Sequence, residues 1–199
     1  MIAITGATGK TGSAIAEALI AKGKKVRVIG RDAVKLSDLG AKGAEIAVGD
    51  LADRSFLSRA FAGAGSVYAL IPPNFGVTDF RAYQTAVGES IVDALKGSAV
   101  KHVVHLSSQG AHLATGTGPI AGLHDQEERL NGLGGVNVLH LRPTYFMENL
   151  LMNIDLIKKM NIMGSAVRGD VRFAMIATRD IASYAAERLA ARDFTGRSV

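Results

Sequence analysis

Residues 1–12, which read MIAITGATGKTG, determine how the rest of the chain is interpreted. The apolar run at 2–5 is typical of a buried strand, and it leads directly into a glycine-rich loop and then a helix-like stretch. In this context Gly6 permits a tight turn, Gly9 lets the backbone approach a pyrophosphate, and Gly12 lets the helix pack closely on the strand. Exposed N–H groups at the start of the helix, assisted by its dipole, then bind the phosphates. The segment therefore predicts a dinucleotide-binding loop.

Two side chains of this loop add to its attraction for anions, since Lys10 supplies a cation and Thr11 a hydroxyl. The alternative is a simple turn between a strand and a helix that binds nothing. The first strand and a following helix around the loop favour the binding interpretation. The predicted phosphate contacts are Gly6, Thr8, Gly9, Lys10, Thr11 and Gly12.

Short apolar runs alternate with helix-like stretches along most of the chain. The runs lie at 2–5, 26–29, 45–48, 67–71, 103–106 and 136–141, and the helix-like stretches at 11–22, 32–39, 54–61, 78–96 and 123–133. Apolar runs without alternation indicate strands covered on both faces, and the β-α-β-α order indicates a parallel sheet. The sequence therefore predicts an α/β protein with a Rossmann-type, doubly wound parallel sheet. Ligands of such a sheet bind beyond the carboxyl ends of its strands.

The pattern changes after the sixth strand. In order, this part contains a helix-like stretch, a glycine-bearing segment, an apolar run and a last helix, at 148–160, 164–169, 172–176 and 179–191. We predict that Thr178 is the N-cap of the last helix. Residues 1–145 are expected to form an NAD(P)-binding domain, and residues 146–199 a small substrate-side cap packed on it. Residues 195–199 contain no evident closing element.

Composition excludes several classes of protein. Of the 199 residues, 48% are hydrophobic and 21% charged, which fits one large folded domain and not a disordered chain. The absence of Cys excludes disulfides, thiolate metal ligands and cysteine nucleophiles, and no other metal-binding pattern stands out. No apolar segment approaches the roughly 20 residues needed to cross a membrane. Because the first residues lack the features of a signal peptide, we expect a cytoplasmic protein.

The chain is basic, with 23 Lys and Arg against 18 Asp and Glu and a net charge of +5. The basic residues are dispersed, and few aromatic residues lie among them, whereas nucleic-acid-binding surfaces concentrate them on one face. We therefore expect no direct contact with nucleic acid. A phosphate-bearing cofactor is a sufficient anionic partner.

The end of the second strand favours NADP(H) over NAD(H). NAD-binding proteins place an acidic residue there for the adenosine ribose. In this chain the expected position is Gly30, and Arg31 follows it. A guanidinium can hold a 2′-phosphate through paired charge-assisted hydrogen bonds. The alternatives are that Arg31 stacks on the adenine or that Asp32 binds the ribose.

Two further strand ends extend this site. Asp50, after the third strand, could accept a hydrogen bond from the adenine amino group. The alternative is that Asp50 caps the next helix, but Asp53 is the better candidate for that role. The fourth strand must leave the sheet at Pro72 and Pro73, which lack N–H groups. This exit lies beside the diphosphate and the nicotinamide ribose. The contacts predicted at these ends are Asp50, Leu51, Leu70, Ile71 and Pro72.

Five segments together resemble the NmrA-like branch of the short-chain dehydrogenase/reductase superfamily. They are TGATGKTG at 5–12, SVYALIPP at 66–73, HVVHLSSQGAH at 102–112, LRPTYFMENLL at 141–151 and TRDIA at 178–182. The loop occurs widely in the superfamily, whereas LRPTYFMEN is more specific to this branch. The resemblance implies a Rossmann domain with a small C-terminal substrate subdomain. The members of this branch include NADPH-dependent quinone and isoflavone-type reductases, as well as non-catalytic regulators that sense NAD(P).

The resemblance also implies roles at the ends of the fifth and sixth strands. Ser107 and Ser108 match the place of the superfamily's catalytic hydroxyl. Residues 143–146 match the lining of the nicotinamide pocket, with Pro143, Tyr145 and Phe146 as the expected contacts. The chain departs from the superfamily in its missing Tyr-x-x-x-Lys pair, in which the lysine helps the tyrosine donate a proton. The residues four positions after its tyrosines are Pro72, Val87, Asn149 and Arg188.

His124 is the candidate that could replace the missing proton donor. Glu127 or Glu128 would share its helical face and orient the imidazole. The alternative is that His124 merely starts a helix and that both carboxylates are solvated. His102, His105 and His140 lie in or beside strands and are expected to be structural, and His112 is a weak candidate in a loop.

Two functions remain open from the sequence. The first is hydride transfer from NADPH to a quinone or similar conjugated acceptor, which needs little proton donation. In that case Ser107, Ser108 and His124 would be catalytic, and the acceptor would be the small-molecule partner. The second is a non-catalytic NADP(H) sensor that binds a protein partner, and homo-oligomers are compatible with either. An epimerase-like enzyme ranks lower, because it also needs the missing Tyr/Lys pair.

Overall fold

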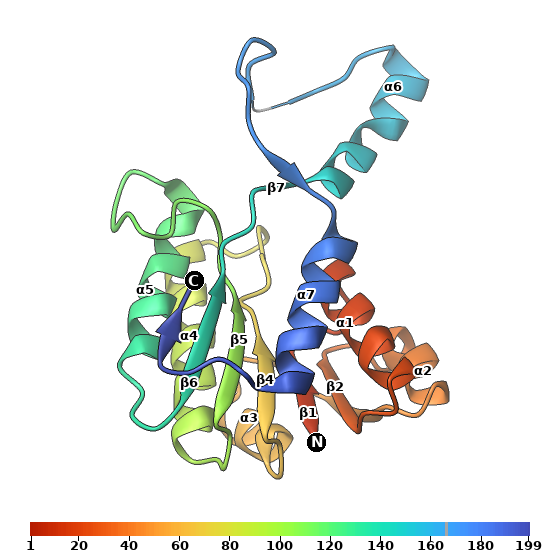
Figure 1. Ribbon diagram of the computed structural model, residues 1–199. Coiled ribbons are helices and arrows are strands. Elements are labelled where there is room, and N and C mark those ends of the chain that lie inside the picture. Colours follow the sequence, from red (N-terminus) through yellow and green to blue (C-terminus); the bar gives the residue numbers. More distant parts are fainter. Residues whose placement is uncertain (166) are drawn as a thin grey trace.

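A parallel sheet is the frame of the molecule in the computed structural model, which describes residues 1–165 and 167–199 (Figure 1). Within that part of the chain, seven strands pair in the order β3-β2-β1-β4-β5-β6-β9. Every pair in the sheet is parallel. The strands are β1 (Ile2–Ile4), β2 (Val26–Gly30), β3 (Glu45–Val48), β4 (Ser66–Ala69), β5 (His102–Leu106), β6 (Asn137–Leu141) and β9 (Arg197–Ser198). The strand order reverses direction between β1 and β4, which is the topological switch point of a doubly wound sheet.

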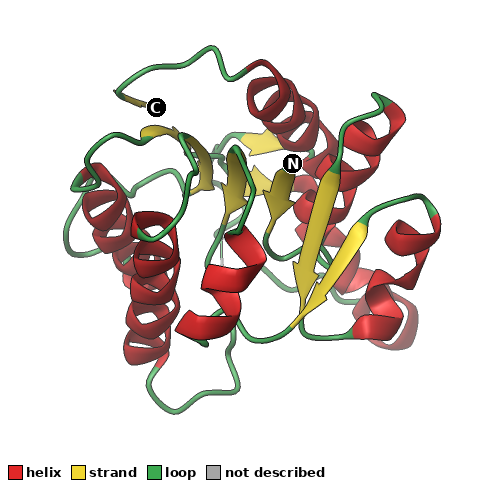
Figure 2. Ribbon diagram, turned by 90° about the horizontal axis from the view of Figure 1, so that it is seen from below, coloured by secondary structure: helices red, strands yellow, loops and turns green. Residues whose placement is uncertain are grey.

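Helices cover both faces of this sheet (Figure 2). One face packs against α1 (Lys10–Ala21), α2 (Ala33–Ala41) and α7 (Thr178–Ala191). The other packs against α3 (Arg54–Phe61), α4 (Phe80–Lys96) and α5 (Ala121–Asn131). The predicted α/β, Rossmann-type architecture is therefore confirmed.

Alternation of side chains between two buried layers explains why the strands read as unbroken apolar runs. In β1, Ile2 and Ile4 belong to the core under α1, whereas Ala3 belongs to the core on the opposite face. The six predicted strand runs are all strands, with small shifts at their ends. For example, β4 ends at Ala69 and not at Ile71, because the N–H of Leu70 donates to the Thr5 hydroxyl at 3.1 Å instead of to a neighbouring strand.

An arm, which we define as residues 147–174, leaves the sheet after β6. It lies between β7 (Tyr145–Phe146) and β8 (Met175–Ile176), which pair with each other. It contains the 3₁₀ helix η2 (Met147–Asn153) and α6 (Ile154–Met160), and Figure 1 shows it extending away from the sheet. A further 3₁₀ turn, η1 (Gly118–Ile120), precedes α5. Residue 166, within the arm, lies outside the described residues.

The C-terminal part differs from the sequence-based expectations at three points. The stretch 148–160 is a 3₁₀ helix followed by an α-helix and not one continuous element. Thr178 is the first residue of α7, and its N–H and hydroxyl donate to the Glu148 carboxylate at 2.9 and 2.7 Å, so that a side chain of the arm caps the helix. Residues 197–198 form β9 beside β6. Two elements of the predicted cap, α7 and β9, lie on the main sheet. The domain boundary at residue 145 stays a prediction.

Candidate functional site

The loop between β1 and α1 has the geometry that its glycines predict. Gly6 has a φ of 61°, in the region that favours glycine, and its carbonyl accepts the N–H of Gly9 at 2.9 Å. A Cβ at Gly12 would lie 2.4 Å from the Gly6 oxygen and 3.0 Å from the Ala7 Cα. The first turn of α1 therefore rests directly on the backbone of the loop, and only glycine fits there.

Several N–H groups of this loop are available to a ligand. Within residues 1–165 and 167–199, the N–H groups of Thr8, Lys10, Thr11 and Gly12 have no hydrogen-bond acceptor. Three of them belong to the first turn of α1, where the helix dipole adds positive potential. Neutralising a diphosphate through such groups requires no rearrangement of the backbone.

The side chains of Lys10 and Thr11 are engaged within the protein. The Lys10 ammonium donates to the carbonyl of Glu148 at 3.0 Å, which ties the loop to the arm. The buried Thr11 hydroxyl accepts from the Tyr68 hydroxyl at 3.0 Å. Burial raises the pKa of Tyr68 well above its ordinary value, with the bond to Thr11 opposing this, so Tyr68 stays protonated. The Thr11 side chain is therefore anchored on the core, while its N–H has no acceptor in the part of the chain that the structure describes.

A small pocket of about 60 Å³ lies at the ends of β2 and β3, where the adenosine was expected. Arg31, Asp50, Leu51 and Pro72 line it together with Thr8 and Gly6. The sequence interpretation missed Tyr83 of α4, which also lines it and carries no motif that could have indicated its place. Burial raises the pKa of the Tyr83 hydroxyl, while the charge of Arg31 lowers it and that of Asp50 raises it.

Arg31 and Asp32 have different environments. The Asp32 carboxylate accepts the N–H groups of Val34 and Lys35 at 3.0 and 3.2 Å and so caps α2. In the part of the chain that the structure describes, the Arg31 guanidinium has no hydrogen bond or ion pair. Asp53 caps α3, as predicted, by accepting the N–H of Phe56 at 3.0 Å. Asp50 accepts the N–H of Ala52 at 2.9 Å and keeps a place on the pocket wall.

A second pocket, of about 350 Å³, lies beyond the ends of β5 and β6. Ser108 and the predicted segment 143–146 line it. The prediction did not include Gln109, Ile120 and Asn149, which complete the lining. Tyr145 packs edge-on against Phe173 of the arm, with 5.4 Å between ring centroids. We call this the β5–β6 pocket.

Ser107 does not share that pocket with Ser108. It is buried, and its hydroxyl donates to Glu127 Oε1 at 2.5 Å. Arg142 donates to the same carboxylate from Nε at 3.0 Å and from Nη2 at 2.5 Å. Burial raises the pKa of Glu127, but the hydrogen bonds from Arg142 and Ser107 outweigh it and leave the pKa below the ordinary value.

The predicted pairing of His124 with Glu127 or Glu128 is wrong. His124 Nδ1 instead donates to the carbonyl of Ala111 at 2.9 Å. Glu127 is held by Arg142 and Ser107, and Glu128 is exposed. Since Glu127 is buried, the alternative of two solvated carboxylates is also incorrect. The structure therefore does not bring Ser107, Ser108 and His124 together in one constellation.

The strand histidines are structural, as expected. His105 and His140 are both buried, and their Nδ1 atoms are 3.0 Å apart. His140 Nε2 also lies 3.1 Å from Asn131 Oδ1. His102 contacts the ring of Phe194 edge-on and lies 3.2 Å from the Asn137 amide. His112 is exposed in its loop.

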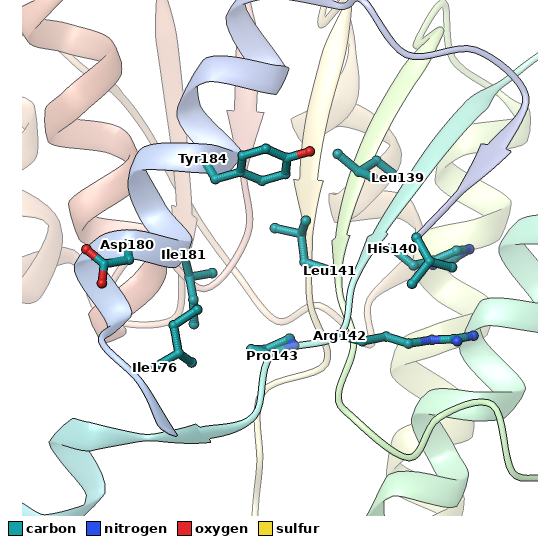
Figure 3. Close-up of a pocket in the computed structure, with 10 residues that line it drawn as sticks. Leu139, His140, Leu141, Arg142, Pro143, Ile176, Asp180, Ile181 and Tyr184 are labelled. Atoms are coloured by element: carbon teal, nitrogen blue, oxygen red, sulfur yellow. The ribbon is translucent and has the colours of Figure 1, made fainter. Parts of the chain in front are cut away.

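A separate apolar pocket of about 370 Å³ lies between β6 and α7 (Figure 3). Leu139 and Leu141 of β6 and Ile181 of α7 form its walls, and Tyr184 and Asp180 border it. Figure 3 shows Arg142 extending from this pocket toward α5, where it meets Glu127. No residue pattern predicted this pocket.

Residues 1–165 and 167–199 lack the features of two other kinds of site. They contain no group of three or more His, Asp or Glu side chains arranged to hold a metal ion. None of the helices in this part of the chain has the length and apolarity needed to cross a membrane.

The strand order and the loop at its switch point define a Rossmann-type nucleotide-binding fold. The model of the NmrA-like family matches residues 1–194, and the chain belongs to the NmrA-like family. It is 29% identical over 191 residues to an NAD(P)H azoreductase of Xenophilus azovorans, covering 95% of this chain and 63% of that protein. It is 26% identical over 199 residues to quinone oxidoreductase 2 of Escherichia coli (strain K12), covering 99% of this chain and 66% of that protein. The chain thus spans less than two thirds of either relative's length.

Solved structures show the same fold. The NADPH complex of an NADPH-dependent quinone oxidoreductase from Escherichia coli superimposes with a TM-score of 0.81 at 24% identity, covering 100% of this chain and 68% of that chain. The NADP(H) complex of triphenylmethane reductase from Citrobacter sp. also gives a TM-score of 0.81, at 21% identity, covering 99% of this chain and 68% of that one. At these identities the likeness concerns the fold.

Proposed function

We propose that this chain binds NADP(H) along the carboxyl edge of its sheet and transfers hydride from NADPH to a quinone or similar conjugated acceptor. The observation that carries the proposal is the loop at 6–12, where unpaired N–H groups surround a close backbone contact that only Gly12 permits. The relatives named as an NAD(P)H azoreductase and a quinone oxidoreductase support the same class of reaction.

The residues present fit a dinucleotide with a 2′-phosphate. The N–H groups of the loop would hold the diphosphate, and the adenine would lie in the pocket bordered by Asp50 and Tyr83. Arg31 has no partner among the described residues, whereas Asp32 is committed to capping α2. A free guanidinium beside the ribose position favours a 2′-phosphate, and a carboxylate that already accepts two N–H groups is a poor ribose ligand. Leu70, Ile71 and Pro72 would border the nicotinamide ribose.

The β5–β6 pocket would hold the nicotinamide and the acceptor. Bound NADPH supplies the hydride, and a quinone that gains this hydride and one proton from solvent becomes a hydroquinone. Ser108 lines the pocket, and its hydroxyl, which donates to the Gln109 carbonyl at 3.1 Å, would rotate to donate to an acceptor oxygen. Ser107 is instead buried against Glu127. Pro143, Tyr145 and Phe146 exclude water and restrict the acceptor's orientation, and Phe173 supports the Tyr145 ring.

The test is NADPH oxidation by the purified protein against a panel of quinones and azo dyes. We expect turnover with at least one acceptor and a preference for NADPH over NADH. The Ser108→Ala variant should turn over more slowly, while Ser58→Ala, on the exposed face of α3, should leave the rate unchanged. Failure of NADPH to bind would refute the proposal.

A non-catalytic NADP(H) sensor is the second candidate. Two observations favour it: the chain lacks a Tyr-x-x-x-Lys pair, and the hydroxyl of Ser107 is buried against Glu127. This function requires tight binding of NADP(H) without turnover of any acceptor in the panel. The same assay therefore separates the two functions.

A further inference from the structure

The ends of β5 and β6 are joined beyond the sheet itself. Leu106 and Leu141 are the last paired residues of these two strands. The next residue, Ser107, continues the pairing with its N–H on the Leu141 carbonyl at 2.7 Å. Gln109 then donates its N–H to the Pro143 carbonyl at 2.9 Å. The two loops that line the β5–β6 pocket therefore begin as a single hydrogen-bonded unit.

One buried carboxylate joins this unit from the side. Glu127 of α5 is 2% exposed and accepts three hydrogen bonds, one from Ser107 and two from Arg142. Ser107 is the first residue after β5 and Arg142 the first after β6. Both oxygens of the carboxylate are used, and the guanidinium binds through two of its nitrogens, an arrangement that fixes direction as well as distance. We call these three residues the clamp.

Packing alone does not explain a charged group at this place. Taking a carboxylate and a guanidinium out of water is costly, and apolar residues of similar volume can often replace such a pair without loss of stability. What apolar residues cannot supply is a defined orientation of two backbone segments. Immediately after the clamp residues come Ser108 and Pro143, which both line the β5–β6 pocket.

We propose that Glu127 is a positioning residue, whose clamp on Ser107 and Arg142 sets where Ser108 and Pro143 stand against the nicotinamide and the acceptor. This inference rests on the proposed function, because it assigns the reaction to that pocket. Ser107 then acts through Glu127 and does not touch the acceptor. The adenine end of the site, at β2 and β3, is on the opposite side of the switch point and is independent of the clamp.

The test compares the two ends of the coenzyme in the Glu127→Gln variant, which keeps the side-chain volume and removes the charge. The measurements are kcat and KM with the best quinone, the Kd of NADPH, and the Kd of adenosine 2′,5′-bisphosphate, which lacks the nicotinamide. Because a small misplacement of reacting groups can cost about a hundredfold in rate, we expect kcat to fall roughly ten- to hundredfold. The Kd of adenosine 2′,5′-bisphosphate should stay unchanged.

Control variants keep the test decisive. Glu89→Gln, on α4, breaks an exposed ion pair with Arg54 of α3 and should change none of these values. If Glu127→Gln does not fold, Arg142→Lys and Ser107→Ala replace it. Arg142→Lys keeps the charge but loses the two-pronged contact, and Ser107→Ala leaves the ion pair intact. Both should therefore lower kcat relative to the unsubstituted protein, by no more than roughly tenfold.

The outcomes separate the two proposals. Wild-type kcat in folded Glu127→Gln, or in both replacements, would overturn the clamp while leaving the proposed function standing. An equal loss of affinity for adenosine 2′,5′-bisphosphate would also overturn it, because a general structural defect would then account for the effect. If the unsubstituted protein bound NADPH without turnover, a selective loss of NADPH affinity in Glu127→Gln would still support the clamp, and its absence would refute it. No NADPH binding by the unsubstituted protein would refute the proposed function, and the inference with it.

Discussion

Gly12→Ala is the substitution whose consequences the structure defines most sharply. The added methyl would lie 2.4 Å from the Gly6 oxygen, 2.8 Å from the Gly6 carbonyl carbon and 3.0 Å from the Ala7 Cα. All three atoms are backbone, so no side-chain rotation can relieve the contact. The first turn of α1 must move away from the loop, and the N–H groups that would hold the diphosphate move with it.

The magnitude follows from two opposing terms. Overpacking of this kind costs about 1–3 kcal/mol, while alanine gains about 1 kcal/mol over glycine within a helix. The net loss is then about 0–2 kcal/mol in the free energy of unfolding. For a chain of this size that lowers Tm by up to about 8 °C. Losing one charge-assisted hydrogen bond to the diphosphate, worth about 1.5–3 kcal/mol, raises the Kd of NADPH roughly ten- to hundredfold.

Thermal unfolding followed by circular dichroism and titration with NADPH measure the two effects. Gly132→Ala, at the end of α5, is the matched control, because its new methyl would meet nothing closer than 3.5 Å. Its φ of −72° suits alanine, so a small gain in stability is expected and no change in binding. A Gly12→Ala protein with wild-type Tm and wild-type Kd would refute the reasoning.

Two further predictions concern the coenzyme and pH. Arg31→Ala should weaken NADPH binding roughly tenfold and leave NADH binding nearly unchanged, because only NADPH carries the 2′-phosphate; equal losses in calorimetric titrations with both coenzymes would contradict this role. Burial lowers the pKa of His105 to about 3, with the charge of His140 acting in the same direction and that of Glu127 opposing it. Between about pH 3 and the ordinary pKa of 6.5, the unfolded chain therefore carries a proton on this side chain that the native protein does not. As the pH falls from 6.5 to 3, this group should lower the free energy of unfolding by up to about 1.4 kcal/mol per pH unit. The free energy of unfolding, measured by urea denaturation at several pH values in that range, should depend less steeply on pH in His105→Asn than in the unsubstituted protein. An unchanged pH dependence would show that His105 does not contribute.

Local signals account for the parts of the site that the sequence predicted well. The turn at Gly6 and the close contact at Gly12 depend on residues within a few positions of each other, so their spacing carries the information. The same holds for Asp53, which caps a helix beginning at the next residue. Arg31 follows its strand directly, and the end of β2 places it on the wall of the pocket at the ends of β2 and β3, as predicted.

Contacts between distant elements explain what the sequence interpretation missed. The i+3 and i+4 spacing placed Glu127 and Glu128 near His124, but Arg142 and Ser107 offered Glu127 a stronger, charge-assisted partnership. Tyr83 reaches the pocket at the ends of β2 and β3 only because α4 brings it there from a distant part of the chain. Glu148 lies 30 positions from the helix that it caps, so no capping pattern could reveal it.

The order of apolar runs and glycines was sufficient to predict the parallel sheet and the tight glycine-rich turn after its first strand, because strand burial and backbone turns depend on neighbouring residues. Which of the adjacent Ser107 and Ser108 lines the pocket was decided by the Glu127 carboxylate, which lies 20 positions from Ser107 on α5. The arm and the closing strand β9 likewise acquire their places from partners far along the chain. Side-chain direction at a strand end is settled by the strongest partner within reach, and that partner is known only when the elements are packed together.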